Sequence, residues 1–223
     1  MTGETLIIWG IGTSRTLRVH WLARELGLDY ETRPVQARTG ETQTPGYLAM
    51  SPKGKVPVLQ HGATVVTESA AILNYLSESY GAGTGVYVPD DAASRAALHD
   101  WCYSVMTELD AHPLYIMRRH DALSDIYGEA PEAVASAAEY FDRMVTALAL
   151  RYPKGEPFLF GERLSIADIL LCTTLGWADN YGLALPAVFA DYLQRVRARP
   201  AFDEATAWND PGASHWHAGG ERG

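Results

Sequence analysis

The chain has 223 residues and a mass of 24.4 kDa, a length that suits one large domain or two small ones. Its residues are 47% hydrophobic and 20% charged, which provides a sizeable core and excludes a chain that is disordered throughout. The net charge of −9 disfavours general binding to nucleic-acid phosphates, and two cysteines exclude a disulfide framework.

We expect no signal peptide and no membrane-spanning segment. Residues 1–4 lack the basic stretch and apolar run of a signal peptide, and no apolar stretch approaches the roughly 20 residues that cross a bilayer. We therefore expect a cytoplasmic protein without a membrane partner. Residues 212–223 are glycine-rich and polar, typical of a loose tail. His215-Trp216-His217 within it has no nearby acid or cysteine, so we expect no metal site.

The N-terminal 80 residues mix strand and helix patterns. Leu6–Trp9 reads as a buried strand, and residues 30–35 read as a second strand. A helix between them is expected to start near Ser14 as its N-cap and to end at Gly27. Its apolar face is formed by Val19, Leu22, Ala23 and Leu26. This order predicts a parallel βαβ unit.

A hairpin and a further helix complete this region. Residues 36–54 are polar and rich in turn formers, with one short helix near 47–50. The segments 56–60 and 64–66 flank a turn and predict an antiparallel hairpin. Pro57 cannot donate a hydrogen bond to a ladder, so it belongs at the beginning or edge of a strand.

From Pro89 onward the hydrophobic period is helical. The apolar stripes run through residues 98–109, 137–148, 167–178 and 189–196. Together with a helix that ends at Gly81, they predict an α/β domain followed by an all-α domain. We place the boundaries at 1–80 for the α/β domain, 81–88 for a linker, 89–211 for the helical domain and 212–223 for the tail.

Ser165 and Asp168 give the clearest helix start in the chain. The Ser165 side chain can accept from the backbone N–H of Asp168, and the carboxylate of Asp168 can reach back to that of Ser165. We therefore expect Asp168 to be structural and not catalytic.

Two predicted helix N-termini in the α/β domain stand beside polar residues. One follows Gly12-Thr13-Ser14-Arg15, and the other follows Thr67-Glu68-Ser69. Helix N-termini carry unpaired N–H groups and a positive partial charge, which bind carboxylates and stabilise thiolates. Both can open on the same edge of a compact sheet, where one would hold an anionic ligand and the other a reactive sulfur.

The order of motifs resembles the glutathione transferases. The segment Ser51-Pro52-Lys53-Gly54-Lys55-Val56-Pro57-Val58-Leu59 is followed by Glu68-Ser69-Ala70-Ala71-Ile72, and later by Leu164-Ser165-Ile166-Ala167-Asp168. The resemblance covers about residues 5–205. It implies an N-terminal thioredoxin-like domain that binds glutathione and a C-terminal helical bundle domain.

The resemblance also implies binding roles. Pro57 would be a cis proline, and the backbone of Val56 would pair with the cysteinyl part of glutathione like a short added strand. Glu68 would bind the γ-glutamyl ammonium, Ser69 the γ-glutamyl carboxylate and Lys55 the glycyl carboxylate. The alternatives are an ordinary helix cap for Ser69, an ordinary first-turn acid for Glu68 and a surface lysine for Lys55.

The resemblance assigns activation of the glutathione thiol to the hydroxyl of Thr13 or Ser14. The register on Arg18-Val19 places the activating hydroxyl of the serine-type classes at Thr13, with Ser14 beside it. The chain has no Ser-Pro-x-Ser or Cys-Pro-x-Cys after its first strand and no tyrosine near residues 5–10, and a threonine here is similar to bacterial classes that reduce glutathionyl disulfides. We favour Thr13; in the alternative interpretation, neither hydroxyl activates sulfur. Cys102 and Cys172 lie on apolar helix faces and are expected to be buried.

The resemblance thus implies a glutathione-dependent enzyme that attacks a small hydrophobic electrophile or a disulfide. It also implies a homodimer. The alternative is a non-catalytic ligand-binding or interaction protein on the same fold, and a third possibility is isomerisation, dehalogenation or ether cleavage by the same thiolate. No metal is implied.

Overall fold

The computed structural model describes residues 4–153 and 155–213, and the chain divides into two compact units. The first unit contains the chain up to Val86 and again from Ala198 on, and the second is Tyr87–Arg197. The His215-Trp216-His217 sequence lies outside the described residues.

The first unit is built on a four-stranded sheet in the order β2-β1-β3-β4. Its strands are β1 (Leu6–Ile11), β2 (Glu31–Gln36), β3 (Val58–His61) and β4 (Thr64–Thr67). β1 and β2 are parallel, whereas β3 is antiparallel to both β1 and β4. The predicted βαβ unit and hairpin are therefore confirmed. Pro34 is tolerated because β2 is an edge strand, and Pro57 directly precedes β3.

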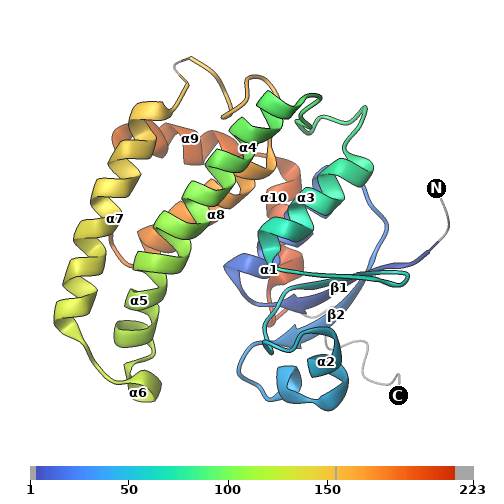
Figure 1. The fold of residues 1–223 in the computed structure, drawn as a ribbon, viewed down its shortest axis with the longest axis horizontal. Helices are drawn as coiled ribbons and strands as arrows, with labels where there is room; N and C mark the ends of the chain where they lie inside the picture. The colour runs from blue at the N-terminus through green and yellow to red at the C-terminus, as the bar shows by residue number, and fades with distance from the viewer. Residues whose placement is uncertain (1–3, 154, 214–223) are drawn as a thin grey trace. The chain divides into compact units, whose positions relative to one another are not determined.

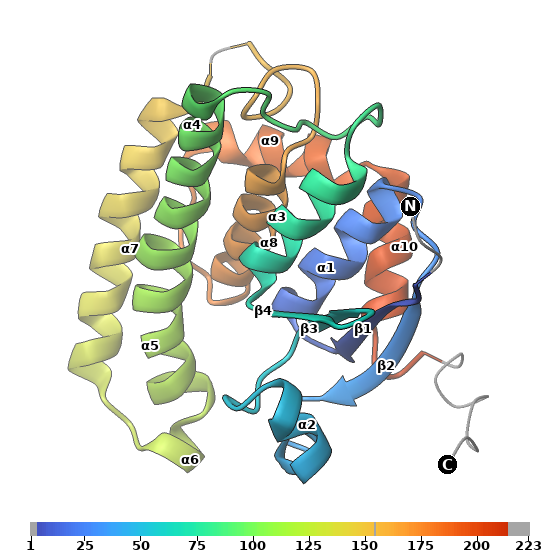
Figure 2. The same ribbon diagram turned by 45° about the vertical axis from the view of Figure 1, so that its right-hand side comes forward.

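Helices cover both faces of this sheet. α1 (Ser14–Glu25) and α3 (Ser69–Tyr80) lie on one face, and α2 (Pro45–Met50), preceded by the 3-10 turn η1 (Glu41–Gln43), lies on the other (Figures 1 and 2). The core between sheet and helices is fully buried and consists of Ile8, Val19, Leu22, Leu59, Ile72 and Leu73. This mixed sheet with helices on both faces is the thioredoxin-like arrangement, as the resemblance implied.

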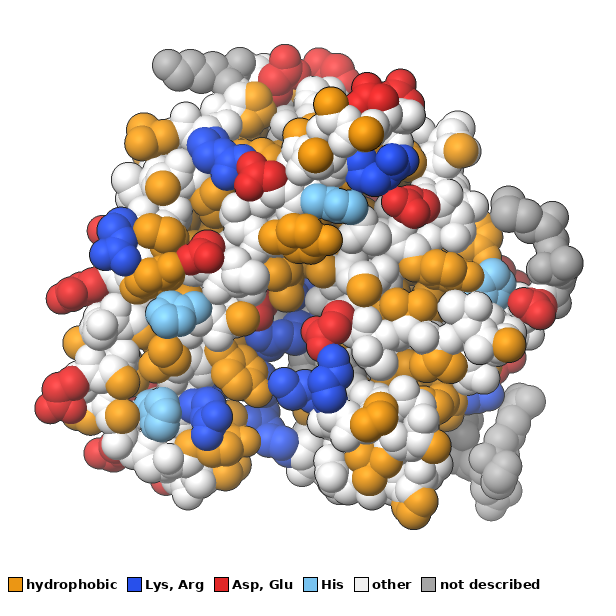
Figure 3. Space-filling model, viewed as in Figure 1, with side chains coloured by type: hydrophobic (Ala, Val, Ile, Leu, Met, Phe, Trp, Pro, Cys, Tyr) orange, Lys and Arg blue, Asp and Glu red, His pale blue; other side chains and the backbone are white. Residues whose placement is uncertain are grey.

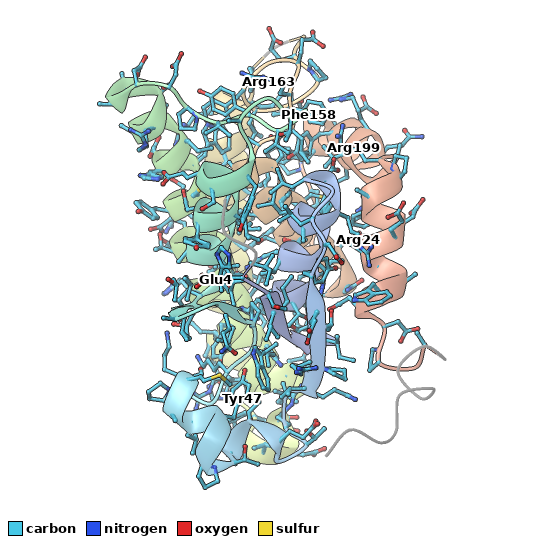
Figure 4. All side chains as sticks on the ribbon, turned by 90° about the vertical axis from the view of Figure 1, so that its right-hand side faces the viewer. Glu4, Arg24, Tyr47, Phe158, Arg163 and Arg199 are labelled. Atoms are coloured by element: carbon cyan, nitrogen blue, oxygen red, sulfur yellow. The ribbon has the colours of Figure 1, made fainter. Side chains whose placement is uncertain are left out.

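The last helix, α10 (Pro200–Asn209), packs on α1 within the first unit. The Phe202 ring meets Trp21 edge-on at 4.8 Å between centroids, and Arg199 forms two hydrogen bonds of 2.6 Å with the Glu25 carboxylate. The predicted helical domain of residues 89–211 therefore differs from the observed units, because its last helix buries its apolar face on the α/β unit. Arg24 and Arg199 lie where the two helices meet (Figure 4).

The second unit is helical. Its elements are α4 (Ala92–Ser104), η2 (Val105–Leu114), α5 (Tyr115–Met117), η3 (Arg118–Ala122), α6 (Ser124–Tyr127), α7 (Pro131–Arg151), α8 (Ile166–Asn180) and α9 (Ala187–Arg197). The apolar stripes predicted from residues 98–109, 137–148, 167–178 and 189–196 supply its core. η2 has the wider π-helical turn and contains Pro113.

Asp168 is structural, as the sequence predicted. Its carboxylate accepts from the Ser165 N–H (2.8 Å) and hydroxyl (2.6 Å), the Leu159 N–H (3.0 Å) and the Tyr192 hydroxyl (3.0 Å). Burial raises the pKa of this carboxyl group, and the bonds from Ser165 and Leu159 oppose that shift. Four donors around one buried acid fix the start of α8.

The surface mixes charge signs. Acidic and basic side chains are interspersed over the face shown in Figure 3. Within the described residues, no helix combines the length and the apolar character needed to span a membrane, and no group of three or more His, Cys, Asp or Glu side chains gathers where a metal would bind.

Candidate active site

Three segments meet at one edge of the first unit's sheet. Trp9 of β1 pairs with Val58 of β3, and Val58 in turn pairs with Thr67 of β4. β1 leaves the sheet shortly after Trp9, β3 enters it at Val58, and β4 leaves it at Thr67. The segments 10–14, 55–57 and 68–69 therefore emerge from the same edge. They carry every residue that the sequence analysis singled out for thiol activation and ligand binding.

The first turn of α1 is closed by threonine and not by serine. Thr13 has an extended backbone, and its hydroxyl accepts from the Thr16 N–H at 3.1 Å, while the Thr16 hydroxyl accepts from the Thr13 N–H at 3.0 Å. Thr13 is therefore the N-cap, and our expectation of Ser14 as the cap is wrong, because the reciprocal box needs a partner three residues ahead of the cap. Ser14 is the first helical residue. Its half-buried hydroxyl has no hydrogen bond within the part of the chain that the structure describes.

The Val56–Pro57 peptide bond is cis, as the resemblance implied. Val56 is buried, yet its N–H and C=O make no backbone hydrogen bond to any residue within 4–153 or 155–213. The preceding carbonyl, that of Lys55, accepts from the Tyr47 hydroxyl at 2.9 Å and from the Ser51 hydroxyl at 3.2 Å. Tyr47 lies on α2 (Figure 4), and burial raises its pKa to about 12, so it remains a proton donor. Val56 therefore presents a fixed backbone edge.

Gly10 brings this edge next to α1. Its φ of +117° is a conformation that side chains rarely adopt. A Cβ on Gly10 would lie 2.6 Å from the Val56 Cβ and 2.8 Å from the Thr16 Cγ2. The end of β1 thus fits between Val56 and the first turn of α1 because it has no side chain there.

His20 of α1 holds the same stretch of β1. Its Nε2 lies 3.0 Å from the Gly10 carbonyl oxygen, and its Nδ1 lies 3.2 Å from the Tyr30 hydroxyl. Because a carbonyl can only accept, we assign the ring proton to Nε2 and let Nδ1 accept from Tyr30. Burial lowers the pKa of His20 to about 4; the Gly10 hydrogen bond opposes the shift and the nearby Arg24 charge adds to it. The ring is neutral at physiological pH.

The start of α3 presents an acid and a buried hydroxyl. Glu68 has a φ of +71°, which is unusual for a residue other than glycine, and its side chain does not cap the helix. Such strained positions persist where the surroundings hold them, often at functional sites. Ser69 is buried, and its hydroxyl oxygen accepts from a guanidinium NH of the fully buried Arg18 at 3.2 Å. The Ser69 proton therefore remains for another acceptor.

Lys53 contacts a candidate site residue and was not selected in the sequence analysis. Its ammonium forms an ion pair with the Glu68 carboxylate, and both side chains are at least half exposed. Lys55, the lysine that we selected, is exposed and directly precedes Val56. The only available signal for this ion pair was that two lysines flank Gly54 in the same loop.

The described cysteines are poor nucleophiles. Cys102 and Cys172 are both buried, as predicted, and burial raises the pKa of each thiol to about 12. A reactive sulfur at this edge would therefore be one that a ligand brings.

Comparison with known proteins agrees with this architecture. The model of the glutathione S-transferase N-terminal domain matches residues 4–78, and that of the C-terminal domain matches residues 130–216. The chain is 30% identical over 192 residues to maleylacetoacetate isomerase of Pseudomonas aeruginosa, covering 83% of this chain and 87% of the relative. It is 29% identical over 159 residues to glutathione S-transferase theta-3 of Mus musculus, covering 70% of this chain and 66% of that relative.

A solved structure of a glutathione transferase from Methylococcus capsulatus superimposes with a TM-score of 0.76 at 27% identity, covering 92% of this chain and 98% of that one. The chain thus combines a thioredoxin-like unit with an all-helical unit, which is a two-domain fold built on the thioredoxin-like superfold. The chain belongs to the glutathione S-transferase family. This membership supports a glutathione-binding, transferase-like function.

Proposed function

We propose that this chain is a glutathione transferase that lays glutathione across the sheet edge and uses its thiolate to attack a small hydrophobic electrophile or a disulfide. The observation that carries the proposal is the strand register Trp9–Val58–Thr67. It brings a helix start, an unpaired backbone and an acid–hydroxyl pair to the same edge. Glutathione has an anionic thiol, an extended peptide backbone and an amino-acid head that match these three features.

The peptide backbone of the ligand would pair with Val56. An extended peptide that adds to a sheet edge gains two main-chain hydrogen bonds for each residue that it faces. Val56 offers both an N–H and a C=O, and the Lys55 carbonyl before it is held by Tyr47 and Ser51. The edge is therefore preorganised, which reduces the entropic cost of binding.

The γ-glutamyl head would bind at the start of α3. The Ser69 hydroxyl has its oxygen occupied by Arg18, so its proton can go to the head's carboxylate, beside the unpaired N–H groups of the helix N-terminus. Glu68 would bind the ammonium, which then takes the place of the Lys53 ammonium. Lys55 would pair with the glycyl carboxylate at the other end of the peptide.

The thiol would be activated at the start of α1. A free thiol has a pKa of about 8.5, and a helix N-terminus together with a donated hydroxyl proton lowers it. The donor would be Thr13 or its neighbour Ser14. The thiol proton leaves to solvent, and the thiolate then forms a bond to carbon as the leaving group departs with its electron pair. With a disulfide, the new bond is S–S and one thiolate is released.

The experiment compares the wild type with Thr13→Ser, Thr13→Ala, Ser14→Ala and the double alanine variant. Conjugation and disulfide-reduction rates are measured, together with the ultraviolet absorbance of the thiolate of bound glutathione. We expect the double variant to lose on the order of 10²-fold in kcat/KM while still binding glutathione. Thr13→Ser keeps both the cap and the hydroxyl, so it controls for loss of the helix cap. Wild-type activity in the double variant would rule out hydroxyl activation, and binding without any turnover in the wild type would favour the non-catalytic alternative.

The proposal includes a homodimer and a cytoplasmic location, both implied by the family resemblance. Light scattering of the full chain at micromolar concentration is expected to give twice the monomer mass, and a monomer would refute the dimer.

A further inference from the structure

The first turn of α1 is held in place by the last residue of α10. The Asn209 Oδ1 accepts from the Thr16 hydroxyl at 2.7 Å and from the Gly12 N–H at 3.2 Å, and its Nδ2 donates to the Thr13 carbonyl at 3.2 Å. The backbone carbonyl of Asn209 also accepts from the Gly12 N–H at 2.9 Å. One residue, 196 positions along the chain from Thr13, thus bonds to the residues on both sides of the N-cap as well as to the cap itself.

Asn209 determines which acceptor the Thr16 hydroxyl bonds to. The Thr16 hydroxyl has one proton and three acceptors in reach: Asn209 Oδ1 at 2.7 Å, the Thr13 carbonyl at 2.8 Å and Thr13 Oγ1 at 3.0 Å. Asn209 offers the shortest of these bonds, and its own N–H supplies a donor to the Thr13 carbonyl in return. Without the Asn209 amide, the Thr16 hydroxyl would donate to Thr13 instead, and the Thr13 hydroxyl would change its hydrogen-bond partners.

α10 holds Asn209 rigidly. Trp208 donates from its indole N–H to the Thr32 hydroxyl on β2 at 2.9 Å, and the Arg24 guanidinium lies 4.8 Å from the Trp208 ring centroid. Arg199 anchors the other end of α10 through its two bonds to Glu25. A hydrogen-bonding group on so fixed a support can hold a functional turn within a few tenths of an ångström.

We propose that Asn209 is a positioning residue for thiol activation: it holds the capped first turn of α1 in the arrangement that stabilises the glutathione thiolate. This inference rests on the proposed function, because it concerns the same thiol. Asn209 acts through Thr13 and Thr16. Its loss therefore changes the pKa of the thiol more than it changes the affinity for the peptide, which is bound at Val56 and Ser69.

The test titrates the thiolate absorbance of bound glutathione against pH in the full chain. We expect Asn209→Ala to raise the thiol pKa by about half to one unit, with glutathione affinity within about threefold of wild type. Asn209→Asp is expected to raise it further, since its carboxylate keeps the acceptor, loses the donor and adds negative charge next to the first turn of α1. Trp208→Phe is the matched control. It removes one contact that supports α10 but keeps the Asn209 amide and its bonds to the first turn of α1, so it is expected to shift the thiol pKa less than Asn209→Ala does.

A second pair of variants covers the case in which Asn209→Ala does not fold. Thr16→Ser keeps the hydroxyl between Asn209 and the cap and is expected to keep the wild-type thiol pKa, whereas Thr16→Val removes it and is expected to reproduce the shift. Wild-type thiol pKa values in both Asn209 variants, or equal shifts in Trp208→Phe, would overturn the inference while leaving the proposed function intact. A wild type whose bound glutathione titrates like the free thiol would overturn both.

Discussion

Acidification provides a quantitative test of how the end of β1 is held. The buried His20 is neutral in the folded protein, with a pKa of about 4 against 6.5 for an ordinary histidine. Between these two pH values His20 is protonated in the unfolded chain but neutral in the folded chain, so the free energy of unfolding falls as the pH falls. The full difference is about 2.5 pH units, or about 3.4 kcal/mol at 1.36 kcal/mol per unit. Most of that loss lies between pH 6.5 and pH 4.

The effect is large against the roughly 5–15 kcal/mol that stabilise a typical domain. Linkage with these two pKa values gives a loss of about 2 kcal/mol between pH 7 and pH 5 from His20 alone. Carboxylates also titrate in this range, and a variant without the imidazole removes their contribution by subtraction. His20→Asn is suitable because it keeps a polar group near the Gly10 carbonyl.

The assay is urea unfolding of the wild type and His20→Asn at pH 7 and pH 5. We expect His20→Asn to be less stable than the wild type at pH 7, because the ring's packing and its bond to Gly10 are lost. At pH 5 that deficit shrinks by about 2 kcal/mol, since only the wild type is destabilised by keeping the buried His20 ring neutral in its folded state. A deficit of equal size at both pH values would refute the reasoning, because it would mean that the imidazole titrates alike in the folded and unfolded states.

Three further variants test the edge itself. Glu68→Gln is expected to weaken glutathione binding about tenfold in titration calorimetry. Lys53→Met is expected to leave the affinity unchanged or to raise it, because the ligand's ammonium then displaces no lysine. Equal affinities for the wild type and Glu68→Gln would remove Glu68 from the site. Gly10→Ala is expected to cost about 2–4 kcal/mol in urea unfolding, since its Cβ would lie 2.6 Å from that of Val56 at a φ of +117°, and an unchanged transition midpoint would contradict the close approach.

Sequence reasoning succeeded where all interacting groups lie close together in the chain. Ser165 and Asp168 are three residues apart, so the complete capping box could be predicted from local chemistry alone. The four strands and the turn between β3 and β4 were predictable for the same reason, because alternation and turn residues are local signals. Pairing of β1 with β3 was accessible only through the resemblance to a known family.

Sequence reasoning failed where the deciding contact is made by a further residue. Thr13 and Ser14 are both acceptable caps, and the choice depends on Thr16, whose hydroxyl closes the box only with Thr13. The ion pair between Lys53 and Glu68 was not predicted, because it depends on how the loop around Gly54 turns. In both cases the contact depends on local geometry that no periodicity identifies.

Net charge is a poor guide to the ligand of this protein. A chain of charge −9 should repel a tripeptide that carries two carboxylates and a thiolate. In the proposed site, the sheet edge would overcome this repulsion locally, because two helix N-termini open there and the Ser69 hydroxyl, with its oxygen occupied by Arg18, presents its proton. These are short-range dipoles and hydrogen bonds, and they act only where the strand register brings the segments together. On the proposed function, recognition of an anionic peptide would therefore depend on the register of three strands more than on the number of charges in the chain.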